Sequence, residues 1–156
     1  MKSNGFTLIE VVVSVSIALA LFGSIIVNYN GHNDRQNLKQ AALTLKNNFR
    51  FVQGKALGGE KPENNCTELV GWTITFVSNS YSMQAQCNPE GLQGGSTQVN
   101  FPSGITFNPI PSAVTFRVLS RGTTLETSTT IILSGFTKTY TLTVSPSGDI
   151  SDLGLQ

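Results

Sequence analysis

Glu10 is the residue whose position most restricts what this chain can do. It is the single charge within the apolar run Phe6–Val27, where an ionised carboxylate costs about 2.5–3.5 kcal/mol on membrane-insertion scales. A positively charged partner would offset this cost. Cutting the chain between Gly5 and Phe6 would supply one, because the cut leaves a free α-amino group. We therefore expect Glu10 to pair with the new N-terminus of another copy of a similar chain.

The two cysteines are the other residues that could take part in a chemical reaction, namely the formation of a disulfide. Cys66 and Cys87 make an even count outside the apolar run, which predicts a disulfide, with two unpaired core thiols as the alternative. Closing this loop would stabilise a small β domain by roughly 3 kcal/mol. A metal site is not expected, because His32 is the only histidine and the sequence has no CxxC pair.

The patterns of common enzyme classes are missing from the sequence. It has no GxSxG, HExxH or GxxxxGK[ST] pattern, and no histidine after His32 that could complete a triad. The formal net charge of +1 attracts neither nucleic acid nor an acidic substrate. With 12% charged residues, the composition favours an extracytoplasmic β-rich protein over a cytosolic enzyme. We predict no enzyme and no cofactor.

The first ten residues carry a family resemblance. The segment Gly5-Phe6-Thr7-Leu8-Ile9-Glu10 resembles the prepilin peptidase recognition motif of type IV pilins and type II secretion pseudopilins. The resemblance implies cleavage between Gly5 and Phe6 on the cytoplasmic face and N-methylation of Phe6. It also implies that Glu10 neutralises the N-terminus of a neighbouring subunit during assembly. The implied partners are other pilin subunits, in a homo- or hetero-filament, the prepilin peptidase and the inner-membrane assembly platform.

The apolar run is long enough to cross a bilayer. Its 22 residues, Phe6–Val27, would form a helix of about 33 Å, against a hydrocarbon core of about 30 Å. Lys2 precedes the run, which places the N-terminus in the cytoplasm and the remainder outside. We expect a single-pass inner-membrane protein that then enters a cell-surface or periplasmic filament. The alternative is a cleavable export signal ending at Ala18-Leu19-Ala20, followed by a secreted soluble β domain.

A polar stretch and a second helical segment follow. Residues 28–34 are polar and include Gly31, so we predict a local break between two helical halves. Beyond it, apolar residues recur at steps of three and four, which predicts an amphipathic helix ending at Gly58-Gly59. The apolar positions are Leu38, Ala42, Leu45, Phe49, Val52 and Ala56. The predicted organisation is a leader at 1–5, a transmembrane and assembly helix at 6–27, a polar break with an amphipathic helix at 28–57, and a β-rich head at 58–156.

The rest of the chain alternates apolar and polar residues, which is typical of strands. A hairpin is predicted from Trp72 to about Cys87. Further short strands are predicted at 98–101, 105–107, 113–119, 129–133 and 138–144, with a turn at 146–149 and a terminal edge strand. The fold class is therefore α+β: a long N-terminal helix packed on an antiparallel sheet. This order of elements resembles the heads of GspH- and FimT-type minor pilins and pseudopilins.

Several functions stay open at this point. Major pilins, minor pilins and pseudopilins share the same N-terminal motif, so adhesion, motility and secretion are not separated. A minor pilin that takes up DNA would need phosphate contacts from Arg117, Arg121 or Lys138, because residues 146–156 contain no Lys or Arg. A nucleic-acid partner is not expected. The triplet Asn65-Cys66-Thr67 fits the N-x-T glycosylation pattern, which is frequent by chance.

Overall fold

The computed structural model describes the backbone of residues 7–156, and the side chains of residues 7–22 and 33–156. The predicted leader at 1–5 lies outside the described residues. The chain divides into two compact units, Met1–Gln36 and Asn37–Gln156. The described residues form one α-helix and eight strands: α1 Leu8–Leu57, β1 Glu68–Val77, β2 Ser80–Asn88, β3 Gly91–Asn100, β4 Ile105–Phe107, β5 Val114–Arg117, β6 Thr129–Gly135, β7 Lys138–Val144 and β8 Ile150–Leu155.

The helix α1 runs without interruption from Leu8 to Leu57, so the predicted break at residues 28–34 is wrong. One glycine inside a helix costs only about 1 kcal/mol relative to alanine. Propagating an existing helix is cooperative, and this stretch holds no proline that would remove a backbone donor. The polar composition of the stretch therefore does not end the helix.

The helix ends at the predicted glycines. Gly59 adopts a left-handed backbone with φ 62°, and its N–H donates to the carbonyl of Ala56 (3.1 Å). The N–H of Glu60 donates to the carbonyl of Lys55 (3.0 Å). This pair of hydrogen bonds is a Schellman cap, which satisfies carbonyls that the last turn would otherwise leave open.

The amphipathic face predicted for the second half of the helix is buried as expected. Each of its six apolar side chains is 0% exposed: Leu38, Ala42, Leu45, Phe49, Val52 and Ala56. The opposite face is open, and Phe51 is 54% exposed there. The helical spacing of apolar residues in the sequence was therefore enough to distinguish the buried face from the exposed one.

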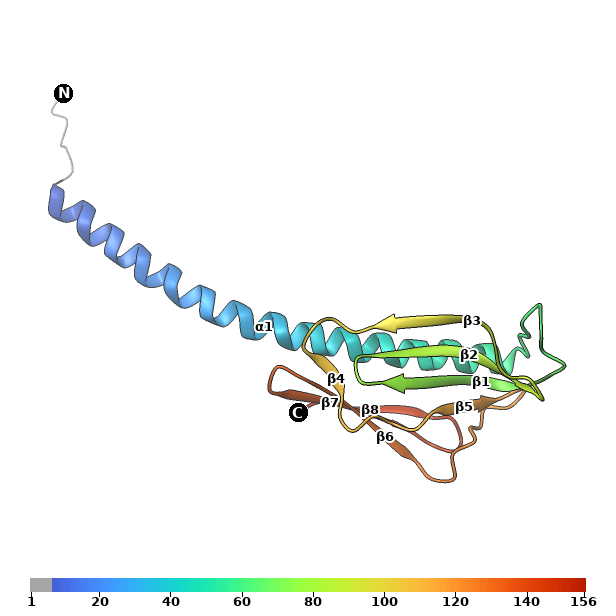
Figure 1. Ribbon diagram of the computed structural model, residues 1–156. Coiled ribbons are helices and arrows are strands. Elements are labelled where there is room, and N and C mark those ends of the chain that lie inside the picture. Colours follow the sequence, from blue (N-terminus) through green and yellow to red (C-terminus); the bar gives the residue numbers. More distant parts are fainter. Residues whose placement is uncertain (1–6) are drawn as a thin grey trace. The chain divides into compact units, whose positions relative to one another are not determined.

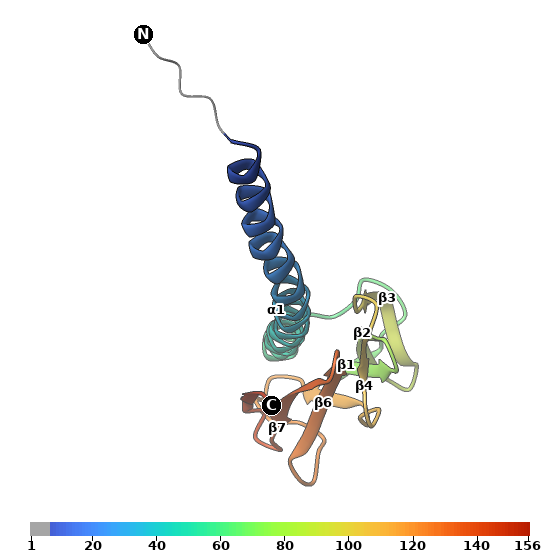
Figure 2. The same cartoon turned by 90° about the vertical axis from the view of Figure 1, so that its left-hand side faces the viewer.

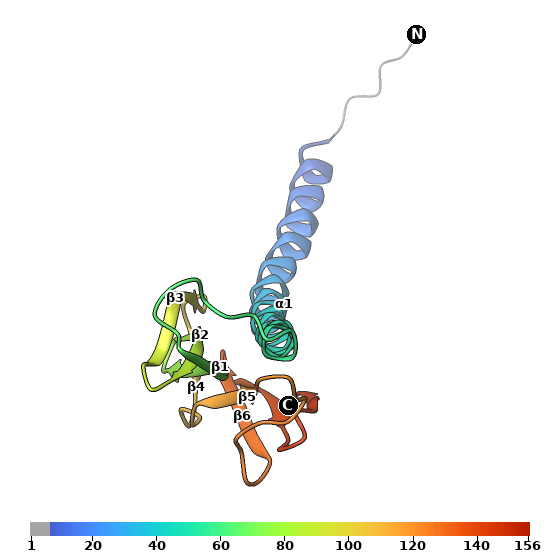
Figure 3. The ribbon, with the colours of Figure 1, turned by 90° about the vertical axis from the view of Figure 1, so that its right-hand side faces the viewer.

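The head contains two antiparallel sheets, where the sequence predicted one (Figure 1). Sheet A has the strand order β3-β2-β1-β5, and sheet B has the order β4-β6-β7-β8. Figures 2 and 3, each turned by 90° from Figure 1, show the two sheets meeting at an angle below the C-terminal part of α1. The α+β class is thus confirmed, with one helix covering two sheets.

Aromatic rings join the helix to both sheets. The ring of Phe49 lies 6.1 Å from that of Phe76 in β1 and 6.2 Å from that of Phe116 in β5. Phe76 in turn contacts Phe107 of β4, at 5.1 Å between centroids with the rings nearly perpendicular. Edge-to-face pairs of this kind add to the energy of burial. Both sheets and the helix therefore share one core.

Most strand predictions agree with the structure. The strands at 105–107 and 138–144 have the predicted bounds, and the terminal strand β8 lies at the edge of sheet B. The prediction at 98–101 captured only the end of β3, which begins at Gly91. This strand is polar and exposed along most of its length, so it lacks the apolar alternation by which a strand is recognised.

Polar contacts fix the second sheet to the helix. The side-chain amide of Gln53 donates to the carbonyl of Gly148 (2.9 Å) in the turn before β8. Lys46 forms an ion pair with Asp152 of β8. Gly148 has φ 85°, and a Cβ there would lie 1.8 Å from the carbonyl oxygen of Arg121, so the turn requires glycine.

Replacing Phe49 tests whether the helix and both sheets depend on one core. Phe49→Ala should lower the free energy of unfolding by about 3–5 kcal/mol, because it removes a fully buried ring between packed neighbours. Phe51→Ala is the matched control and should change it by no more than about 1 kcal/mol, the upper range of an exposed contact with Lys55. Denaturant unfolding of the detergent-solubilised chain, followed by fluorescence of the single Trp72, measures both. Equal effects of the two substitutions would contradict the shared core.

Candidate functional site

The start of the helix forms a reciprocal cap around Glu10. The N–H of Glu10 lies 3.4 Å from the hydroxyl oxygen of Thr7, and the N–H of Thr7 lies 3.5 Å from the Glu10 carboxylate. This is the geometry of a capping box, with Thr7 as the N-cap and Glu10 three residues later. Both distances exceed the usual 2.7–3.2 Å for N–H···O bonds, so the two contacts are weak.

This cap was not predicted, although its pattern is visible in the sequence. Thr7-Leu8-Ile9-Glu10 fits the form S/T-x-x-E that marks helix starts. From the sequence, Glu10 was expected to pair only with a partner outside the chain. In the structure the carboxylate also lies in the first turn of α1, where the helix dipole favours a negative charge.

The two serines near Glu10 need no outside partner. The hydroxyl of Ser14 donates to the carbonyl of Glu10 (2.7 Å), and that of Ser16 donates to the carbonyl of Val12 (2.8 Å). Such bonds to the carbonyl four residues earlier satisfy the hydroxyl within its own helix. The polar side chains of this segment thus divide into serines satisfied locally and one carboxylate held only by long contacts.

The first turns of α1 are apolar on all sides. Ten large apolar side chains between Leu8 and Phe22 are each more than half exposed, from 51% at Val13 to 84% at Leu8. The exposed side chains are Leu8, Ile9, Val11, Val12, Val13, Val15, Ile17, Leu19, Leu21 and Phe22. A helix that is apolar all round requires an apolar environment on every side.

Within the described residues, no helix is both long enough and apolar enough to cross a membrane. Gly5 and Phe6, between which cleavage is predicted, lie outside the described residues. Cleavage, methylation and the membrane span remain predictions from the sequence.

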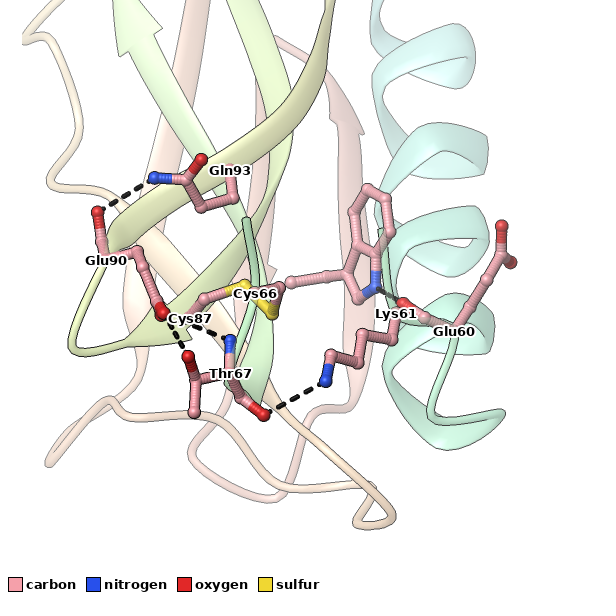
Figure 4. The surroundings of a disulfide bond; sticks show 8 residues. Glu60, Lys61, Cys66, Thr67, Cys87, Glu90 and Gln93 are labelled. Atoms are coloured by element: carbon pink, nitrogen blue, oxygen red, sulfur yellow. Dashed lines mark hydrogen bonds between the residues drawn. A yellow bond between two sulfur atoms is a disulfide. The ribbon is translucent and has the colours of Figure 1, made fainter. Parts of the chain in front are cut away.

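In the head, Cys66 and Cys87 are joined by a disulfide with a Cα–Cα distance of 5.3 Å (Figure 4). Cys66 lies near the end of the loop after α1, and Cys87 lies in β2, where it pairs with Leu69 and Gly91. Both cysteines are buried. The bond therefore ties the loop at 58–67 to the middle strands of sheet A.

Contacts around this disulfide hold the same loop at both ends. The indole N–H of Trp72 donates to the carbonyl of Glu60 (2.8 Å). The ammonium of Lys61 donates to the carbonyl of Thr67 (3.0 Å), as Figure 4 shows. The ammonium of Lys55 lies 4.5 Å from the centre of the Trp72 ring, a cation–π contact. The loop is thus fastened to the end of the helix and to β1.

Glu90 connects the loop to the turn between β2 and β3. The hydroxyl and the N–H of Thr67 both donate to its carboxylate. The hydroxyl bond is the main reason that the pKa of Glu90 is lowered, with smaller contributions from backbone N–H groups and from Lys61. Hydrogen bonds to the ionised form stabilise it over the protonated form.

Two of the three residues proposed for phosphate contact lie in different sheets, and the third, Arg121, precedes Gly122, whose carbonyl accepts from the N–H of Arg117 (3.0 Å). Arg117 ends β5 in sheet A, whereas Lys138 begins β7 in sheet B. In the C-terminal segment, Asp152 is paired with Lys46. Among the described residues, no group of three or more potential ligands could hold a metal ion.

Comparison with protein families shows that residues 1–26 match the model of the prokaryotic N-terminal methylation motif. No curated protein and no solved structure matches the chain. The match supports the resemblance to type IV pilins and pseudopilins, whose precursors are processed by a prepilin peptidase. It covers 26 of the 156 residues and includes Gly5, Phe6 and Glu10.

Acid should weaken the contact between the loop and Glu90. Because the folded state lowers the pKa of Glu90 below its ordinary 4.5, its contribution to stability is present above about that pH and is lost as the pH falls through the folded-state pKa. Glu90→Gln removes this titration, so its melting temperature should fall less steeply than that of the wild type below pH 4.5. Melting curves at a series of pH values check this. Glu126→Gln, at an exposed carboxylate, is the control, and Glu90→Gln curves parallel to wild type would contradict the assignment.

Proposed function

We propose that this chain is a structural subunit of a type IV pilus-like filament, either a minor pilin or a pseudopilin. The observation that carries the proposal is a single weakly held carboxylate, Glu10, in an all-round apolar helix start that lies within the matched methylation motif. A soluble enzyme has no use for this combination. An assembling subunit does, because both the charge and the apolar surface find partners in neighbouring subunits.

The proposed sequence of events begins in the inner membrane. A prepilin peptidase cuts the precursor between Gly5 and Phe6, which removes the leader at 1–5, and Phe6 is N-methylated. The apolar segment at 6–27 holds the subunit in the bilayer with its head outside. The inner-membrane assembly platform then moves it into a filament at the cell surface or in the periplasm.

Each part of the subunit has a separate task in this proposal. Lipid covers the apolar segment first, and helices of neighbouring subunits cover it later, so the exposed side chains stay out of water throughout. Residues 28–57 complete the helix, and the apolar face between Leu38 and Ala56 is buried in the head. The head at 58–156 folds around that face and presents the outer surface of the filament.

Substituting Glu10 separates assembly from the preceding steps. Glu10→Ala should leave membrane insertion and cleavage intact but abolish assembly, because the incoming N-terminus finds no carboxylate. Glu10→Gln keeps a side chain able to cap the helix but removes the charge, and it should fail in the same way. Sheared filaments and membrane fractions, probed for the subunit, measure the outcome. Ser14→Ala is the control and should assemble, since that hydroxyl bonds only to its own helix. If Glu10→Gln is incorporated normally, assembly does not require the negative charge of Glu10.

Mass analysis of the N-terminus tests processing. In protein isolated from its native membrane or filament fraction, the chain should start at N-methylated Phe6, and Gly5→Ala should leave an uncut precursor. A mature chain produced normally from Gly5→Ala would refute the cleavage site. A chain that starts after Ala20 would identify a secreted soluble domain and overturn the filament proposal.

A further inference from the structure

The loop between α1 and β1 carries a modification pattern that the proposed function does not use. Asn65-Cys66-Thr67 is the only N-x-S/T triplet in the sequence. Such triplets accept N-linked saccharides when they lie on exposed loops of exported proteins. Because the pattern alone is frequent by chance, the surroundings of Asn65 must show whether the triplet indicates a modification site.

Those surroundings suit a modified asparagine. Asn65 is exposed and lies in an irregular segment after the helix. Its backbone is left-handed, with φ 55°, a conformation that asparagine tolerates better than most residues. The next residue, Cys66, is buried. The chain therefore turns inward directly after an asparagine whose side chain remains at the surface.

A cavity of about 680 Å³ opens beside this asparagine. Asn65 lines it together with Asn64, Gln93 and Trp72. The volume falls within the range of about 300–1,000 Å³ typical of small-molecule sites. The indole gives the cavity one rigid apolar wall, because its N–H is bonded to the carbonyl of Glu60. The side-chain amides supply hydrogen-bond donors and acceptors.

The residues that line this cavity are complementary to a sugar. A pyranose carries C–H groups on its ring face and hydroxyls around its edge, so it matches an apolar ring next to amide groups. A neutral ligand also fits the charges of the lining: Glu60 is paired with Lys55, which leaves one carboxylate, Glu63, and one ammonium, Lys61, in the cavity. The acceptor asparagine and the cavity are independent observations, and they meet at the same residue.

We propose that Asn65 is N-glycosylated and that the first sugar of the glycan lies in this cavity against Trp72. The donor is a saccharide linked through diphosphate to a polyprenyl lipid. The amide nitrogen of Asn65 forms a bond to the anomeric carbon, and the bond from that carbon to the diphosphate oxygen breaks. The lipid diphosphate leaves with the electron pair, and the amide proton passes to a base. The inference rests on the proposed function only in that the head must be exported.

The folded loop sets the order of events. The hydroxyl of Thr67 donates to Glu90, and Cys66 is held in the disulfide (Figure 4). A transferase must bind all three residues of the triplet, which these contacts hold against the sheet. Glycosylation therefore precedes closure of the Cys66–Cys87 bond. A chain with Cys66→Ser and Cys87→Ser retains an N-x-T triplet and should be modified at least as fully as the wild type.

The test is mass analysis of the peptide that contains Asn65, in protein from its native cells. We expect a saccharide on this peptide, lost in Asn65→Gln and Thr67→Ala, and retained in the matched controls Asn64→Gln and Thr67→Ser. An unmodified wild-type peptide would overturn the proposal, as would modification that persists in Asn65→Gln. Lower occupancy without the two cysteines would refute the proposed order.

Two further measurements separate the parts of the argument. The N-terminal peptide from the same sample shows whether processing at Phe6 has occurred: a processed chain with a bare Asn65 defeats this inference alone, and a glycosylated chain with an intact leader defeats the filament proposal alone. Removing the glycan with an amidase should shift the emission of Trp72, the single tryptophan. An unchanged emission would exclude the sugar from the cavity.

Discussion

Burial of one helix face under two sheets is the constraint on which the head depends. A sheet with one apolar face and a helix with one apolar stripe are each unstable alone in water. Here the two sheets meet at an angle, and the second half of α1 covers the core that they share. Phe49 occupies this position, touching Phe76 and Phe116, while Phe76 carries the contact on to Phe107 of the other sheet. Neither sheet can be separated from the helix without exposing the core of the other.

The disulfide and its neighbours perform a different task. They do not extend the core but hold an irregular loop against the start of β1. The loop contains little apolar area of its own, so burial cannot order it. Instead, the Cys66–Cys87 bond, the Trp72 indole and the Glu90 carboxylate each fix one point along it. The order of this region thus depends on specific bonds, and it responds to reduction and to acid in ways that the core does not.

The sequence predicted what hydrophobic periodicity encodes. The buried face of the second helical half, the bounds of two strands and the terminal edge strand all follow from apolar spacing. Three features did not. The division into two sheets is a property of strand pairing, which periodicity does not contain. The long β3 is polar and exposed, and therefore carries no pattern. The predicted break near Gly31 was wrong because it was judged from the local composition, whereas a helix of 50 residues is a cooperative unit that tolerates one glycine.

At the candidate site, Glu10 was identified because it is a charged residue in an apolar segment. Its capping contact with Thr7 could have been predicted as well, but only from the T-x-x-E pattern at the start of the helix.

The cap at Glu10 does not compete with its proposed role in assembly. A carboxylate has two oxygens and about four acceptor positions, and the contact with Thr7 occupies one of them at the long distance of 3.5 Å. Exchanging so long a bond to a neutral N–H for a short bond to an ammonium group costs little and gains more, since the ammonium brings a positive charge and such N⁺–H···O⁻ bonds are about 2.7–2.9 Å long. The cap and the helix dipole keep the carboxylate in the first turn of the helix, and in the sequence Glu10 follows shortly after the bond proposed for cleavage. In the proposed filament, the same location would present it to the α-amino group of a neighbour, so one residue could begin the helix in the free subunit and link subunits after assembly.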